Sequence, residues 1–245
     1  MLSNWINIFS FFSTLLFTHI SLFGLSHEER LVFFKKRGFK PKVIYDIGAY
    51  HGEWTKNISA IFPKSRFYMF EANIKHQSNL EKIGHPYFIG VLGNENKLTK
   101  FYSIDGTGDS LLREQTFLYE KGRCREETVM MSTLQKVIEE HSIPRPDLVK
   151  LDVQGAEKMI IEGGLNIITN AEMIILETKI LPYNQDAPLA TEIMTYMDQI
   201  GYNLLDIAEL HYFGQGNKRE LFEVDFIFVK KTSPFFRRGI LIKEG

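Results

Sequence analysis

An acidic residue and two glycines near the start of the chain have the types and spacing of a small-molecule binding turn. In residues 43–54 (VIYDIGAYHGEW), Asp46 closes an apolar run, and Gly48 and Gly52 flank the residues that follow. Glycine lets a backbone turn tightly and approach a ligand closely. The start of a following helix offers unpaired N–H groups and the positive end of a dipole. The segment therefore predicts a strand, a ligand-binding turn that includes Ala49, and a helix.

A second carboxylate closes the next apolar run. Residues 66–71 (RFYMFE) end in Glu71, at the spacing at which nucleotide-binding α/β folds hold ribose hydroxyls. The first turn lacks the third glycine of the dinucleotide pattern, and Asp46 would put negative charge near a pyrophosphate, so a cationic nucleoside without phosphate fits better. S-adenosylmethionine has this chemistry, with Asp46 and loop amides holding its charged amino-acid end and Glu71 its ribose. The alternatives are a turn former for Asp46 and a solvated strand end for Glu71.

Composition gives a globular chain of ordinary type. The 245 residues, 44% hydrophobic and 24% charged, are enough for one domain with a small extension. The formal net charge of −1 gives no reason to expect a nucleic-acid partner. The lone Cys124 cannot form an internal disulfide, which favours a reducing, cytoplasmic location.

The first 26 residues contain no Asp, Glu, Lys or Arg, and their apolar residues recur at helical spacing. Neither the positive start nor the cleavage site of a signal peptide is present, and polar residues dilute the run of ~20 apolar residues that a spanning helix needs. Two alternatives stay open for the helix over residues 1–25: docking on the domain or a partner, or membrane association. Ser26 and Glu29 resemble a capping box that opens a second helix, to about Arg37.

Strand and helix patterns alternate along the rest of the chain, which predicts an α/β fold with a mainly parallel, doubly wound sheet and an antiparallel C-terminal strand. We divide the chain into N-terminal helices (1–40), a main domain (41–231) and a basic tail (232–245). Residues 105–125 are rich in glycine and charge and predict a loop or lid. The predicted strands cover residues 43–47, 66–71, 86–92, 98–104, 127–131, 147–152, 172–177, 202–207 and 222–229. The predicted helices cover residues 52–61, 74–83, 156–162 and 190–200, with a further one opened by a capping box at Ser132.

Four motifs, in this order along the chain, resemble the FkbM-type S-adenosylmethionine-dependent methyltransferases. They are DIGAYHG at 46–52, FEA at 70–72, GDSL at 108–111 and KLDVQGAE at 150–157. The resemblance extends over roughly residues 40–230 and implies a Rossmann-like class I methyltransferase fold. It also implies methylation of an oxygen on a small molecule or a glycan. Asp109 and Ser110, which follow a flexible glycine pair, are expected to close over cofactor or substrate, or else to form a solvated turn.

Methyl transfer to oxygen needs alignment, exclusion of water and removal of a proton. Asp152 is the first candidate for the base, because it closes a predicted strand in the KLDVQGAE motif. Glu177, at the end of the next strand, is the second, and Lys150 would orient either or bind an acidic substrate. The alternative is a salt-bridged turn.

Gln154 stands where many members of the family have Glu. An amide there is a poor base and weakens any case for a metal. His51 and His76 have no second histidine at metal-ligand spacing, so no metal site is expected.

Two other functions fit parts of the pattern. A nicotinamide or nucleotide-sugar enzyme would use the same first turn and Glu71, but the missing third glycine argues against it. A non-catalytic cofactor-binding scaffold is the other, and the joint presence of Asp46, Gly48, Gly52 and Asp152 argues against decay. The composition of residues 105–125 and 178–190, the expected acceptor loops, does not identify the acceptor.

Overall fold

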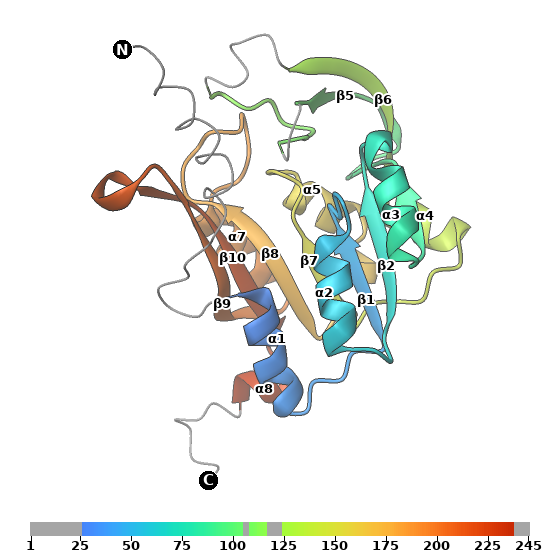
Figure 1. Ribbon diagram of the computed structural model, residues 1–245, viewed down its shortest axis with the longest axis vertical. Coiled ribbons are helices and arrows are strands. Elements are labelled where there is room, and N and C mark those ends of the chain that lie inside the picture. Colours follow the sequence, from blue (N-terminus) through green and yellow to red (C-terminus); the bar gives the residue numbers. More distant parts are fainter. Residues whose placement is uncertain (1–25, 105–107, 117–123, 238–245) are drawn as a thin grey trace, which may run out of the picture.

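The computed structural model describes residues 26–104, 108–116 and 124–237. Its main element is a seven-stranded sheet with the order β3-β2-β1-β7-β8-β10-β9 (Figure 1). Only β10 runs antiparallel to its neighbours, and the remaining pairs are parallel. The predicted α/β, doubly wound sheet with a reversed C-terminal strand is therefore confirmed. The strands are β1 (Val43–Ile47), β2 (Arg66–Glu71), β3 (Tyr87–Ile89), β7 (Leu148–Leu151), β8 (Met173–Lys179), β9 (Tyr202–Phe213) and β10 (Glu220–Lys230).

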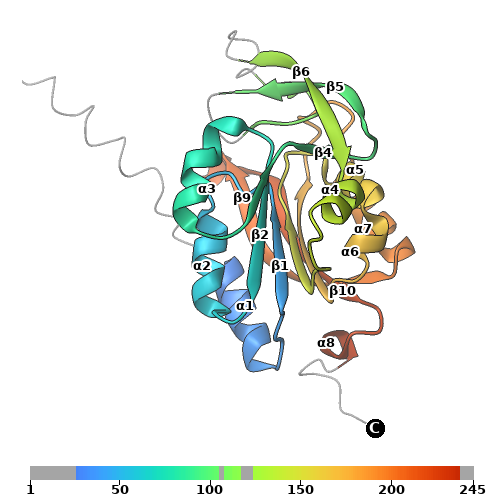
Figure 2. The same cartoon turned by 90° about the vertical axis from the view of Figure 1, so that its right-hand side faces the viewer.

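Helices cover both faces of this sheet (Figures 1 and 2). On one face, α1 and α2 pack Leu31, Phe34 and Ile58 against the strands. On the other, α4 to α7 pack side chains such as Ile161 and Ile193. The helices are α1 (His27–Lys36), α2 (Glu53–Ile61), α3 (Gln77–Ile83), α4 (Leu134–Glu140), α5 (Glu157–Gly163), α6 (Leu165–Ile168), α7 (Ala190–Gln199) and α8 (Pro234–Arg237), with 3-10 turns η1 (Ile74–His76) and η3 (Gly216–Lys218).

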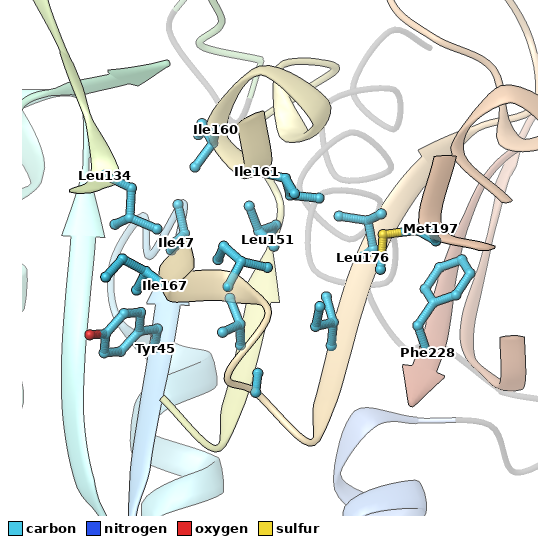
Figure 3. Packing of buried hydrophobic residues seen from close by; sticks show 14 of the residues in the cluster. Tyr45, Ile47, Leu134, Leu151, Ile160, Ile161, Ile167, Leu176, Met197 and Phe228 are labelled. Atoms are coloured by element: carbon cyan, nitrogen blue, oxygen red, sulfur yellow. The ribbon is translucent and has the colours of Figure 1, made fainter. Parts of the chain in front are cut away.

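The central strands are apolar on both faces because both faces are covered. Successive side chains of a strand point to opposite sides, so Tyr45 and Ile47 of β1 join the cluster under α4 to α7, whereas Ile44 joins the cluster under α1 and α2. Figure 3 shows the first cluster, in which Ile47 lies near Leu151 of the neighbouring strand. This double burial leaves the strand ends as the places where polar side chains meet solvent.

A second, three-stranded sheet lies beyond the carboxyl ends of β1 and β2 (Figures 1 and 2). Its order is β4-β6-β5, formed by β4 (Val91–Gly93), β5 (Lys97–Ser103) and β6 (Arg125–Thr133). The single strand predicted over 86–92 is wrong in extent, because β3 belongs to the main sheet and β4 to the small one. Gly90 separates them, and its N–H donates to the Glu71 carbonyl at 2.9 Å.

Two helix starts test the predicted caps. The Ser26 hydroxyl accepts from the Glu29 N–H at 3.2 Å, as predicted. The cap expected at Ser132 is wrong by one residue, because β6 continues through it, and the Thr133 hydroxyl accepts from the Lys136 N–H at 3.2 Å.

Two segments were predicted outside the main domain, one before residue 41 and one after residue 231. The helix predicted over 1–25 lies outside the described residues. Among the helices of the described ranges, none has the length and apolar character needed to cross a membrane. In the segment predicted as a basic tail, the Phe235 ring contacts those of Phe34 and Phe39, with centroids 6.1 and 5.7 Å apart.

The contact between α5 and β4 depends on a glycine. A Cβ added at Gly163 would lie 2.0 Å from the Gly93 carbonyl oxygen, which is inside van der Waals contact. We expect Gly163→Ala to lower the free energy of unfolding by about 1–3 kcal/mol, the usual cost of overpacking. Urea unfolding followed by circular dichroism measures this.

The matched control is Glu162→Ala on the exposed side of the same helix, where only an i,i+4 pair with Lys158 is lost. That change should cost less than about 1 kcal/mol. Equal stability of the two variants would show that the close approach does not matter.

Candidate active site

A buried lysine joins the ends of β1 and β7. The Lys150 ammonium lies 3.4 Å from Asp46 Oδ1 and 3.2 Å from Asp152 Oδ2, and its side chain is 8% exposed. Burial opposes the charge, but the two carboxylates outweigh it and raise the pKa of Lys150. Lys150 is therefore a permanent cation between the two strand ends.

Asp46 supports the site from behind. Its carboxylate is fully buried and accepts from the Thr55 hydroxyl of α2 at 2.7 Å. The sequence analysis expects it to hold the charged end of the cofactor, but Asp46 does not line the cavity described below. The geometry instead gives it the task of holding Lys150 and α2 in place.

The glycine turn packs directly on the turn after β7. Gly48 has a φ of +80°, and a Cβ there would lie 1.8 Å from the Asp152 carbonyl oxygen. Lys150 also donates to the Gly48 carbonyl at 3.2 Å. Gly52 begins α2 with a φ of +78°, where an added Cβ would meet Ile83 at 2.7 Å. Both glycines are needed for close approach as well as for their backbone angles.

Glu71, at the end of the neighbouring strand β2, holds the glycine turn in place. One carboxylate oxygen accepts from the Tyr50 N–H at 2.7 Å and the other from the Asn73 N–H at 2.8 Å. Each carboxylate oxygen retains a second acceptor position, and Glu71 lines the cavity. Burial raises the pKa of Glu71, against the effect of these two N–H groups. The carboxylate is thus rigidly placed and still able to accept a ribose hydroxyl.

Asp109 and Ser110 link the turn after Glu71 to the turn after β7. Asp109 accepts from the Asn73 side-chain amide at 2.6 Å and from the Ile104 N–H at 2.8 Å. The Ser110 hydroxyl donates to the Gln154 carbonyl at 2.7 Å. The described part of the predicted lid therefore joins the Glu71 turn to the turn after β7, and both residues line the cavity.

Gln154 joins the two candidate catalytic carboxylates. Its side-chain N–H₂ lies 3.2 Å from Asp152 Oδ1 and 3.0 Å from Glu177 Oε2, and its oxygen accepts from Lys179 at 3.2 Å. The backbone of Gln154 has a φ of +58°, which is costly for a residue with a side chain. An amide can donate to both acids, which a carboxylate at this position could not do.

Glu177 is the more enclosed of the two acids. Lys179 donates to it at 2.9 Å and also pairs with Glu223. Burial and the nearby Asp152 raise the pKa of Glu177 well above its usual range, despite Lys179. Asp152 is 37% exposed in its side chain, so it is the acid more open to a substrate.

These side chains surround a cavity of about 1330 Å³. That exceeds the ~300–1,000 Å³ typical of one small-ligand pocket and leaves room for a donor and an acceptor side by side. The predicted site residues split into two groups: Asp46 and Gly52 lie outside the lining, and the others contribute to it. Those others are Gly48, Ala49, Glu71, Asp109, Ser110, Lys150, Asp152 and Glu177.

The cavity also contains side chains that the sequence analysis did not select. At the Glu71 end, the rings of Tyr50 and His51 stack at 3.7 Å, and His76 lies 4.9 Å from His51. The only function considered for His51 and His76 from the sequence was metal binding, and Tyr50 was given no role. At the other end, His211 and Phe222 reach the cavity from β9 and β10, and β9 continues to Phe213, well beyond its predicted end at residue 207. The alternation of polar and apolar residues in 208–213 was the available signal.

Removing the buried cation tests this arrangement. We expect Lys150→Met to lower the free energy of unfolding by about 3–5 kcal/mol, because Asp46 then remains buried without its counter-charge. Adding Asp46→Asn in the same chain should recover part of the loss. Denaturant unfolding of the single and double variants measures both values.

Lys158→Met is the control, since Lys158 is a partly exposed lysine that pairs with Glu162 and lies over the Tyr196 ring, and it should cost less than about 1 kcal/mol. If Lys150→Met were as mild as Lys158→Met, the ammonium would not join the strands.

Comparison with known proteins identifies the family. The model of the methyltransferase FkbM domain matches residues 46–204, more than half of the chain. Among curated proteins, none matches this sequence.

Several solved methyltransferase structures are similar at low identity. The precorrin-6y C5,15-methyltransferase of Geobacter metallireducens is 16% identical with a TM-score of 0.47, over 84% of this chain and 87% of that one. The methyltransferase FkbM of Methylobacillus flagellatus is 11% identical with a TM-score of 0.46, over 82% of this chain and 48% of that one. TYW2 of M. jannaschii, in complex with AdoMet, is 13% identical with a TM-score of 0.39, over 83% and 74%. Because the FkbM domain model matches more than half of its length, the chain belongs to the FkbM family of S-adenosylmethionine-dependent methyltransferases.

Proposed function

We propose that the protein transfers the methyl group of S-adenosylmethionine to a hydroxyl of a small molecule or a glycan. The observation that carries this proposal is the cavity, which Glu71 and the glycine turn line together with Asp152 and Lys150. In the sheet, β2 and β1 lie on one side of β7 and β8 on the other. Donor and acceptor would therefore lie on opposite sides of Asp152, the geometry that in-line transfer needs.

The donor end is the side of β1 and β2. The ribose hydroxyls would bond to Glu71, and the backbone of the turn at Gly48 and Ala49, which lines the cavity, would lie against the amino-acid end. The rings of Tyr50 and His76 add apolar surface near this end. Asp46 does not line the cavity. The carboxylates that do line it would therefore balance the positive charge of the donor.

The step forms an oxygen–methyl bond and breaks the methyl–sulfur bond. The electron pair of the broken bond stays on sulfur, which turns the sulfonium into the neutral thioether of S-adenosylhomocysteine. The hydroxyl proton passes to Asp152, for which Lys150 fixes the position of the carboxylate. Glu177, held by Gln154 and Lys179, would direct the acceptor through its remaining lone pairs.

The cavity argues against a nucleic-acid acceptor. Along β8 to β10 its wall includes Glu177, Glu209, Glu220 and Glu223, which would repel a phosphate backbone. The chain also has a formal net charge of −1, which gives no overall electrostatic attraction to such a polymer.

Calorimetric titration separates the candidate functions. S-adenosylhomocysteine should bind and NAD should not, because Glu71 offers a ribose contact whereas the carboxylates nearby disfavour a pyrophosphate. Binding of NAD alone would support a nicotinamide enzyme, and binding of neither would support the scaffold. Incubating labelled S-adenosylmethionine with extract of the source cell, followed by mass spectrometry, would then identify the acceptor and the methylated atom.

Asp152→Asn tests the proposed base. Turnover should fall at least about 100-fold, the lower range for loss of a general base, while the affinity for S-adenosylhomocysteine changes only a few fold. Initial rates with labelled donor and calorimetry give the two quantities. Asp198→Asn, at an exposed site on α7 paired with Lys231, is the control and should leave both unchanged. Unchanged turnover in Asp152→Asn would remove Asp152 from the mechanism.

A further inference from the structure

A chain of four side chains runs from α2 to the cavity. The Trp54 indole N–H donates to His27 Nδ1 at 2.9 Å. His27 Nε2 lies 2.7 Å from Asp225 Oδ2, and His211 Nε2 lies 3.1 Å from the same oxygen. Trp54 and His211 are cavity-lining residues, whereas His27 and Asp225 are buried.

The first contact fixes the proton on His27. An indole nitrogen can only donate, so His27 Nδ1 must accept and its proton must lie on Nε2. That N–H then donates to Asp225. The carboxylate of Asp225 is thereby held in one orientation by a side chain of α1.

Asp225 in turn fixes His211. The imidazole presents Nε2–H to the carboxylate, so its second nitrogen, Nδ1, is left for another partner. Within the described part of the chain, Nδ1 has no hydrogen-bond partner, and the side chain is 26% exposed at the cavity wall. The ring also contacts Phe222 edge-on, with centroids 6.4 Å apart. The ring is therefore oriented on one side and open on the other.

The position of His211 is the acceptor side of the cavity. β9 and β10 lie beyond β8 in the sheet, away from β1 and β2. A ring nitrogen of His211 and one carboxylate oxygen each of Asp225 and Glu177 all lie within 4.8 Å of one another, and Gln154 connects Glu177 to Asp152. His211 thus lies beside Glu177, which Gln154 links to the proposed base, on the side opposite the glycine turn.

Charged groups around His211 come from its own strand, from β10 and β8, and from α1. They are Glu209 on its own strand, Asp225 and Glu223 on β10, Glu177 and Lys179 on β8, and His27 on α1. Burial would lower the pKa of His211, but the bond to Asp225 and the nearby Glu209 and Glu223 raise it to about 9. Below that pH both ring nitrogens carry a proton, and Nδ1 donates.

A metal ion is the other ligand that these groups suggest. His27, Glu209 and Asp225 form one set with metal-like spacing, and Glu177, His211 and Asp225 form a second. In the first set, the proton that Trp54 directs to His27 Nε2 occupies the ligand atom. In the second set, the Lys179 ammonium already lies 2.9 Å from Glu177. A proton thus occupies one ligand atom of the first set, and an ammonium group occupies one residue of the second. An oxygen atom of an organic compound is therefore a better ligand here than a metal ion.

We propose that His211 is an acceptor-binding residue, which donates a hydrogen bond from Nδ1 to an oxygen of the acceptor near the hydroxyl that is methylated. The inference rests on the proposed function and adds a substrate class: compounds with a second oxygen close to the reacting one, such as polyols or hydroxycarbonyl compounds. Asp225 is the positioning residue for His211, and His27 for Asp225. Neither need touch the acceptor.

The first test uses the protein alone. In histidine-labelled full-length protein, nuclear magnetic resonance should show one imidazole that titrates near 9 and whose signal is absent from His211→Asn. Asp225→Asn should lower that pKa by at least about one unit, since it removes the carboxylate. Titration of His211 near its ordinary value of about 6.5 in the wild-type protein would overturn the proposal.

The second test uses the acceptor found by the labelling experiment. His211→Asn should raise the acceptor KM at least about tenfold and leave the affinity for S-adenosylhomocysteine within twofold. The wild-type kcat/KM should fall as the pH rises through about 9, where His211 loses its proton, and Asp225→Asn should move that fall to lower pH. An unchanged acceptor KM in His211→Asn would overturn the proposal.

The controls separate this inference from the proposed function. His141→Asn, at an exposed position at the end of α4, should change none of these quantities. If the wild-type protein bound no S-adenosylhomocysteine or methylated no oxygen, the proposed function itself would fail. If it methylated an oxygen and His211→Asn behaved as His141→Asn does, only the role of His211 would fail.

Discussion

The site depends on one buried ammonium group. Lys150 lies between the carboxylates of Asp46 and Asp152 and also holds the Gly48 carbonyl. Two acids at adjacent strand ends would repel each other without a cation between them, and a buried charge without a partner is costly. The lysine therefore allows β1 and β7 to end in acids side by side, and it brings the glycine turn onto the turn after β7.

The order of the strands places this turn in a row of residues that can bind ligands. Because ligands bind at the carboxyl ends of parallel strands, the row β2-β1-β7-β8 places Glu71, Gly48, Asp152 and Glu177 in that sequence along one edge. Gln154 then fixes the distance between the last two acids. A single cavity can in this way take a nucleoside at one end and an acceptor at the other.

Local patterns in the sequence were enough for most of the main sheet. Short apolar runs that end in carboxylates predicted β1, β2, β7 and β8, because strands covered on both faces are apolar throughout. The run over 86–92 gave one strand where there are two, since only tertiary contacts decide that the chain changes sheets at Gly90. The last part of β9, residues 208–213, was missed because it carries polar residues that a solvated loop would also carry.

The sequence predicted which residues belong to the site better than it predicted which of them contact one another. Glu71 and Asp152 were selected for their place at strand ends, and both line the cavity. That Asp46 faces a lysine 104 residues later in the chain, with no opening toward the cavity, depends on the pairing of β1 with β7. His211 had no motif to mark it, because its environment comes from α1, α2 and β10 together.

The most direct measurement of this account is a crystal structure of the protein with S-adenosylhomocysteine. The account predicts the ribose hydroxyls on Glu71, the amino-acid end at the Gly48 turn, and the sulfur directed toward Asp152 on the side of β8. A ligand bound elsewhere, with Glu71 and Asp152 free of any contact to it, would contradict the central claim.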